Sequence, residues 1–149
     1  MTPAPAPIPV APPAIVFHVE RTARPDEAQI IFLPKILDAI AQVESGRNDH
    51  AHGPDGELTR YQIKPATWRR FSAIPMASAG PDEVWRVANL ILAEIIRSRR
   101  LITPFYIALG WRCGPNWLVP TLQELDYANR VQALYNDAGR TISLPANPQ

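Results

Sequence analysis

The chain has 149 residues, a formal net charge of +1 and 46% hydrophobic residues, which suits one compact domain with a sizeable core. The near-neutral charge does not indicate a nucleic-acid-binding protein, because such proteins carry an excess of cations to neutralise phosphates. The single cysteine, Cys113, excludes an intrachain disulfide framework, and no apolar stretch reaches the roughly 20 residues of a membrane-spanning helix.

The N-terminal segment, residues 1–28, is predicted to be an extended arm. Prolines recur between Pro3 and Pro13, and proline fixes φ and donates no backbone hydrogen bond. The segment has no basic stretch followed by an unbroken apolar run, so it does not resemble a secretory signal. We interpret it as a tether, with a globular domain over residues 29–140 and a loose tail over 141–149.

Five or so helices and one small β excursion are predicted, so the fold class is mainly α, or α+β with a minimal β-hairpin. The first helix has Pro34 in its first turn and ends at Gly46. Its apolar residues recur at helical spacing: Leu33, Ile36, Leu37, Ile40 and Val43. A polar, turn-rich stretch covers 47–58, a short strand or hairpin arm covers 58–63, and a second helix covers 65–71.

The later helices carry clear end signals. A helix over residues 81–100 has acidic residues in its first turn and arginines in its last. Thr103 and Pro104 begin a helix that runs to about residue 111, and Thr121 and Glu124 have capping-box spacing at the start of the last helix. That last helix is predicted to bury Leu122, Leu125, Val131 and Leu134.

Glu44 is the most informative residue for function. It follows Ile40 by four positions and Leu37 by seven, so its carboxylate lies on the apolar face of the helix. Burial and the negative end of the helix dipole would both raise its pKa. A glutamate that keeps its proton near neutral pH is suited to be a general acid. The alternative is a glutamate that reaches water at a frayed helix end.

The residues after Glu44 form a spaced motif. Glu44 and Ser45 end the helix, Asn48 follows, Gln62 stands eighteen positions after Glu44, and Pro65-Ala-Thr67 opens the next helix. This pattern resembles the catalytic region of the soluble lytic transglycosylases, within the lysozyme-like superfamily. In that family a Glu-Ser pair is followed by an Asn, a small-residue turn, a Gly-Leu-Met-Gln element and a Pro-x-Thr helix start.

The resemblance continues downstream and covers roughly residues 33–138. Residues 110–115 take the place of the family's Ala-Tyr-Asn-Ala-Gly-Pro element, and Tyr127 opens the counterpart of its closing Tyr-Val-x-x-Val helix. The chain departs from the pattern in both elements: Thr59 replaces a Gly, Arg60-Tyr61 replaces the Leu-Met pair, Trp111 replaces a Tyr and Arg112 replaces an Asn. An arginine near Glu44 would favour the ionised carboxylate and lower its pKa, against the general-acid role.

The resemblance implies a lysozyme-like fold and a cofactor-free enzyme that cleaves peptidoglycan strands between N-acetylmuramic acid and N-acetylglucosamine. Glu44 would protonate the glycosidic oxygen and then accept the proton of the sugar's own 6-hydroxyl as a 1,6-anhydro ring closes. Six residues are the expected substrate contacts: Ser45, Tyr61, Gln62, Trp111, Arg112 and Tyr127. The enzyme would act in the cell envelope, as a periplasmic or exported protein, or in a phage virion.

Two alternatives remain open at this stage. A hydrolytic lysozyme would need a second carboxylate, for which Asp49, Asp55 and Glu57 are candidates, although Asp55 is typical of a turn and the others of solvated loop charges. A glycan-binding or structural module would instead have Glu44 paired with an arginine, or the cleft filled. An enzyme needs Glu44 to face an open cleft.

No metal site is expected from the sequence. His18, His50 and His52 are the three histidines, and their spacing matches no closed zinc pattern.

Overall fold

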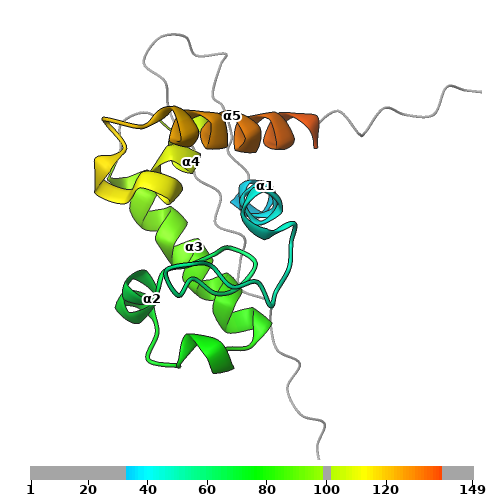
Figure 1. Ribbon diagram of the computed structural model, residues 1–149, viewed down its shortest axis with the longest axis vertical. Coiled ribbons are helices and arrows are strands. Elements are labelled where there is room, and N and C mark those ends of the chain that lie inside the picture. Colours follow the sequence, from blue (N-terminus) through cyan, green and yellow to red (C-terminus); the bar gives the residue numbers. More distant parts are fainter. Residues whose placement is uncertain (1–32, 99–101, 139–149) are drawn as a thin grey trace, which may run out of the picture.

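The computed structural model describes residues 33–98 and 102–138 (Figure 1). The predicted arm (1–28), the predicted tail (141–149) and His18 therefore lie outside the described residues. The α-helices are α1 (Leu33–Ser45), α2 (Pro65–Phe71), α3 (Pro81–Arg97), α4 (Pro104–Cys113) and α5 (Leu122–Asp137). Two short 3-10 helices, η1 (Met76–Ser78) and η2 (Gly114–Asn116), join them.

Strand pairing is minimal in the described part of the chain. It consists of two isolated antiparallel bridges, His52 to Leu58 and Leu58 to Ile63. The segment between α1 and α2 is thus a hairpin-like loop, held by short backbone contacts. The predicted fold class, mainly α with a minimal hairpin, is confirmed.

The helix ends follow the sequence signals. Thr103 accepts a hydrogen bond from the Tyr106 backbone N–H at the start of α4. Thr121 and Glu124 form the predicted capping box of α5, in which each side chain accepts from the other residue's backbone N–H. Gly46, with φ at +63°, ends α1 in the left-handed region that favours glycine. Helix α3 ends at Arg97, before the predicted limit of 100.

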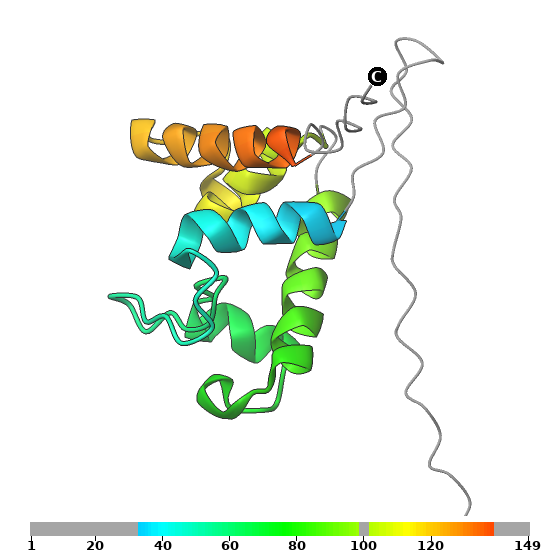
Figure 2. The ribbon, with the colours of Figure 1, turned by 90° about the vertical axis from the view of Figure 1, so that its right-hand side faces the viewer.

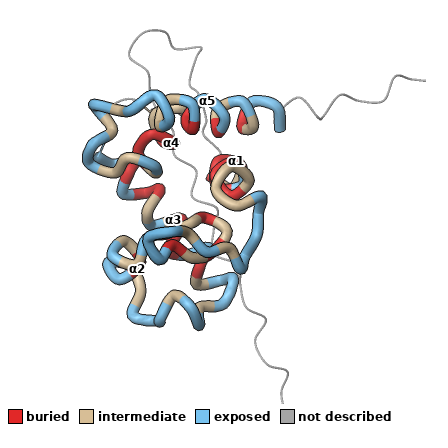
Figure 3. The backbone as a smooth tube through the Cα atoms, viewed as in Figure 1, coloured by how far each residue is buried: buried red, intermediate tan, exposed pale blue. Residues whose placement is uncertain are grey.

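The core forms where the helices cross. Helix α5 packs on α4 and α1, while α3 packs on α4, α1 and α2. Figure 3 shows buried segments along the facing sides of these helices. The largest fully buried side chain of the core is Trp68, on α2. The Trp68 Nε1 donates a hydrogen bond to the carbonyl oxygen of Ile74 at 2.6 Å. Four of the five apolar residues predicted for α1 are fully buried as well: Leu33, Ile36, Leu37 and Ile40.

The predicted inner face of α5 is partly wrong. Leu122 is 85% exposed, and the buried residues are Tyr127, Ala128, Val131 and Tyr135. At 100° per residue, Leu122 points about 140° away from Tyr127 around the helix. The two tyrosines take the inner positions because a tyrosine can bury its ring as well as an aliphatic side chain can.

The C-terminal end of α1 lies between two parts of the molecule. In Figure 2, α5 and α4 lie on one side of this end, and the hairpin-like loop of residues 46–63 projects on the other. Side chains from α1, α4, α5 and the loop can therefore meet there. Within the described ranges, no helix is long and apolar enough to cross a membrane.

Candidate active site

Glu44 lies in the last turn of α1, and its side chain is only 8% exposed. It is placed there by the apolar face that also buries Leu37 and Ile40, seven and four positions earlier. The expected position of the carboxylate, on the buried face at the helix end, is confirmed.

Burial is the main influence on the ionisation of Glu44. Desolvation raises the pKa of its carboxyl group above the usual value, and the negative charge of Glu57 adds to the rise. The Tyr127 hydroxyl, Arg112 and Arg130 act in the opposite direction. The pKa of Glu44 is raised on balance. Burial therefore outweighs Arg112, whose charge was expected to lower this pKa and so oppose the general-acid role.

Tyr127 brings a buried hydroxyl to this carboxylate. The residue is 4% exposed, and its hydroxyl is the one buried side-chain polar atom that has no hydrogen-bond partner among the described residues. It lies close enough to Glu44 to affect it, although not in hydrogen-bonding geometry. Burial, and then the Glu44 charge, raise the pKa of Tyr127 well above its usual range. A buried polar atom without a partner is costly, so packing alone does not explain the hydroxyl at this position.

Arg112 lies at the outer limit of an ion pair with Glu44. One guanidinium nitrogen is 3.9 Å from Glu44 Oε2, and the Arg112 side chain is 54% exposed. The guanidinium also lies over the Tyr127 ring, 5.6 Å from its centroid. No hydrogen bond joins Arg112 to Glu44, so the pair is looser than the closed arginine–glutamate pair expected of a structural module.

Glu57 is the second buried carboxylate near Glu44. It is 9% exposed, so the interpretation of Glu57 as a solvated loop charge is wrong. Hydrogen bonds from its own backbone N–H and from that of Asp55, at 2.8 Å, stabilise the carboxylate and lower its pKa. The backbone N–H groups of the tight turn thus provide the hydrogen-bond donors that the buried Glu57 carboxylate needs.

Gly53 makes room for Glu57 and Gln62. A Cβ atom at residue 53 would stand 2.8 Å from Gln62 Oε1 and equally close to the Glu57 Cβ. The Gln62 amide nitrogen donates to the Thr59 carbonyl oxygen at 2.9 Å. Both Thr59 and Gln62 have positive φ, at 73° and 49°, a conformation that costs energy in a non-glycine residue. The loop is thus strained where it meets the site.

Ser45 fastens the loop to α1. Its hydroxyl donates to the Arg60 carbonyl oxygen at 2.7 Å and accepts from the Asn48 backbone N–H at 3.0 Å. The hydroxyl is thus engaged with the backbone, and substrate contact by Ser45 stays a prediction.

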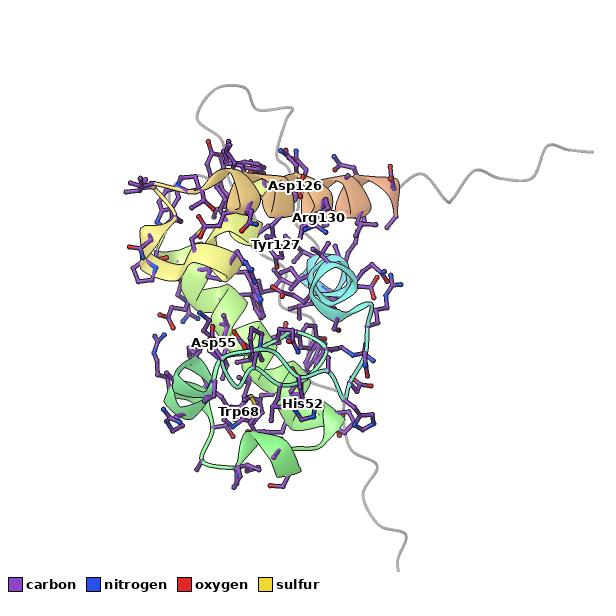
Figure 4. The ribbon with its side chains drawn as sticks, in the orientation of Figure 1. His52, Asp55, Trp68, Asp126, Tyr127 and Arg130 are labelled. Carbon is purple, nitrogen blue, oxygen red and sulfur yellow. The ribbon has the colours of Figure 1, made fainter. Side chains whose placement is uncertain are left out.

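The other two candidate carboxylates are exposed. Asp49 pairs with Arg60 at 2.6 Å, and Asp55 is exposed in the turn. Figure 4 shows Asp55 on the loop side of the molecule, apart from Tyr127 and Arg130 on α5.

Two aromatic side chains connect the loop to α4. The Tyr61 and Trp111 rings meet edge to face, with centroids 6.3 Å apart. Tyr61 is buried, at 6% exposure, and Trp111 is half-buried against the core. Their packing holds the loop against α4, and a stacking role toward sugars stays a prediction for both.

Two open grooves flank this region. One, of about 490 Å³, is lined by Arg112, Leu122, Gln123, Asp126, Tyr127 and Arg130, and Figure 4 labels three of these on α5. The other, of about 580 Å³, lies between the loop and the start of α3, with Tyr61, His52 and Trp85 in its wall. The chemistry points to the smaller groove, because it shares Arg112 and Tyr127 with the surroundings of Glu44. The described residues bring no three potential metal ligands together.

Sequence reasoning missed three parts of the site. Gly53 gave only a turn signal, no motif singled out Arg130, and the burial of Glu57 depends on backbone donors that no motif reveals. The orientation of Tyr127 could have been predicted from the capping box. The box fixes where α5 begins, and the helical period then puts Tyr127 on the same face as Val131.

A mainly α domain with a buried glutamate at the end of its first helix, beside a short hairpin loop, is a lysozyme-like fold. No protein-family model matches the chain. Among characterised proteins the chain is similar to "Resuscitation-promoting factor RpfC" of Mycobacterium tuberculosis (strain ATCC 35801 / TMC 107 / Erdman), with 43% identity over 58 residues. The match covers 38% of this chain and 41% of that protein. The chain thus spans less than half the length of this relative.

Proposed function

We propose that this protein cleaves the glycan strands of peptidoglycan between N-acetylmuramic acid and N-acetylglucosamine, as a lytic transglycosylase of the soluble type. One observation carries the proposal: Glu44 is a buried carboxyl group with a raised pKa, and its neighbours Arg112 and Tyr127 line an open groove. The partial similarity to RpfC supports a lysozyme-like domain that acts on peptidoglycan.

In the proposed mechanism Glu44 acts twice. Its proton goes to the glycosidic oxygen as the bond to the anomeric carbon breaks, which gives the leaving sugar a neutral hydroxyl group. The glutamate, now ionised, accepts the proton of the 6-hydroxyl as that oxygen bonds to the anomeric carbon. The products are a 1,6-anhydro end and a shortened strand, and no cofactor or water enters the balance.

The surroundings of Glu44 fit both halves of this cycle. Burial favours the protonated form before the reaction. After the first proton transfer, the Tyr127 hydroxyl and the Arg130 charge favour the ionised form. A group whose two states are each supported in this way can give up a proton and then take one back.

Hydrolysis is the second candidate, and Glu57 favours it. The environment raises the pKa of Glu44 and lowers that of Glu57, and such a divergence typifies an acid and base pair. In this version Glu57 would activate a water molecule on the other face of the sugar. Both versions make Glu44 the acid.

The proposal also sets where the protein acts. Peptidoglycan is reached in the cell envelope, by a periplasmic or exported protein, or from a phage virion. The proline-rich segment would serve as a tether in either setting.

The masses of the products test the proposal. Purified protein, Glu44→Gln and Glu57→Gln are each incubated with peptidoglycan, and the released muropeptides are analysed by mass spectrometry. We expect ends that lack one water, from the wild type and Glu57→Gln but not from Glu44→Gln. Hydrated reducing ends that vanish with Glu57→Gln would establish the hydrolase. No release by a folded wild-type protein would favour a glycan-binding module.

A further inference from the structure

Arg112 is the most unusual side chain around Glu44. It stands where the resemblance has a neutral amide, and it carries a full positive charge to within 3.9 Å of the proposed acid. Even so, it makes no hydrogen bond with any described residue, and its side chain is 54% exposed. Its contacts are the loose approach to Glu44 and the face of the Tyr127 ring.

The guanidinium opens onto the smaller groove. Arg112 on α4 lines this groove together with Tyr127 and Arg130 on α5. Arg130 already holds Asp126 at 3.0 Å, one turn away on the same helix. Arg112 is therefore the cation of this groove whose fork of N–H donors is still available, and such a fork matches a carboxylate in two parallel hydrogen bonds.

We propose that Arg112 binds a carboxylate that the glycan strand carries beside the scissile bond, and that this contact draws the guanidinium away from Glu44. The inference rests on the proposed function. The carboxylate is the lactyl group of a muramic acid that has lost its peptide. Because Arg112 is so close to Glu44, the anion it holds must belong to a sugar next to the bond that Glu44 protonates.

This exchange would resolve the opposition between Arg112 and the general acid. In the free protein the cation favours ionised Glu44. A substrate carboxylate offers Arg112 better geometry than a 3.9 Å contact with a buried group, so the guanidinium turns outward. Glu44 then keeps its burial but loses the nearby cation, and its protonated form is favoured when substrate is bound. Glu57, Arg130 and Tyr127 also face Glu44, and the exchange leaves them in place.

The experiment compares two glycan preparations that differ only in this charge. The first is strands stripped of peptide by an amidase, which carry free lactyl carboxylates. The second is the same strands after carbodiimide coupling to methylamine, which turns each carboxylate into a neutral amide. Intact peptidoglycan is a third substrate, in which the lactyl group is blocked and the peptides carry the carboxylates.

Binding is measured by calorimetry with Glu44→Gln, which cannot turn over, and with the double variant Glu44→Gln/Arg112→Gln. We expect the single variant to bind the charged strands about tenfold more tightly than the capped strands, as for one charge-assisted hydrogen-bonded pair. The double variant should bind both equally. Glu44→Gln/Arg69→Gln is the matched control, because Arg69 is an exposed arginine on α2, and it should keep the preference.

Cleavage rates of the proteins with Glu44 intact should show the same ratio, which Arg112→Gln should lose. Equal binding of charged and capped strands by Glu44→Gln, or a preference that survives in the double variant, would overturn the proposal while leaving the proposed function standing. Tighter binding of intact peptidoglycan than of both stripped preparations would mean that Arg112 binds a carboxylate of the peptide. That result would also overturn the proposal. If no preparation binds or is cleaved, the proposed function fails as well.

Discussion

Tyr127→Phe removes the buried hydroxyl group beside Glu44. The ring is 4% exposed and its hydroxyl has no hydrogen-bond partner among the described residues. The substitution keeps the ring in its packing position on α5, against α1 and α4. It therefore separates what the hydroxyl does for stability from what it does to the neighbouring carboxyl group.

The size of the stability effect follows from the missing partner. A buried polar group without a hydrogen bond costs about 1–3 kcal/mol. The gap left by one oxygen atom returns part of this, so we expect the free energy of unfolding to rise by about 1 kcal/mol. For a domain of this size that is an increase of about 4 °C in Tm.

The same substitution should change the pH dependence of cleavage. The Tyr127 hydroxyl lowers the pKa of Glu44, so its removal raises that pKa further. A general acid works only while protonated, and the rate falls as pH rises through its pKa. The alkaline limb of the pH–rate profile should therefore move to higher pH in Tyr127→Phe.

Both effects are measured on one protein preparation, by urea unfolding and by muropeptide release between pH 4 and 9. Tyr61→Phe is the control for stability, because Tyr61 is also a buried tyrosine, at 6% exposure, but its hydroxyl is not a buried unpaired atom. A loss of more than about 1 kcal/mol in Tyr127→Phe would mean that the hydroxyl is well hydrogen-bonded. A shift of the alkaline limb to lower pH would also refute the reasoning.

Four further outcomes are expected. Trp68→Ala should cost about 3–5 kcal/mol in urea unfolding, because it empties the largest fully buried site; a cost below 1 kcal/mol would contradict the packing described. Thr121→Ala should cost about 1 kcal/mol through the lost cap of α5, and Thr121→Ser should restore most of it. Gly53→Ala should cost about 1–3 kcal/mol, since the new Cβ must displace the Glu57 and Gln62 side chains; unchanged stability would contradict the close approach at residue 53. Glu44 binds its proton more tightly in the folded state, so the free energy of unfolding should fall as pH rises from about 4.5 through the raised pKa. Glu44→Gln should remove that part of the pH dependence, and an unchanged slope would assign it to another group.

Much of the helical framework could be predicted because it rests on local signals. Proline at the first position and threonine at the cap fixed the starts of α2 and α4 to within a residue. Leu122 misled the prediction for α5, because a leucine beside a helix start looks like a core residue. Its exposure follows from the helix register, which the capping box sets and the burial of Tyr127 confirms.

The site was predictable only in part, for a physical reason. Glu44 follows from helical periodicity, and its raised pKa from burial. The balance among Arg112, Tyr127 and Glu57 depends on how four separate segments meet in space, and no spacing along the chain carries that information. Glu57 shows this most clearly, since backbone N–H groups of its own turn stabilise it.

The protonation of Glu44 is the central claim, and a carbon-13 NMR titration of the glutamate side-chain carboxyl groups tests it most directly. Comparison with Glu44→Gln assigns the resonance. The structure predicts that this resonance titrates above 4.5, the ordinary value, because the side chain is 8% exposed. A midpoint at or below 4.5 would mean that Arg112 outweighs burial and that Glu44 enters the reaction without a proton to give.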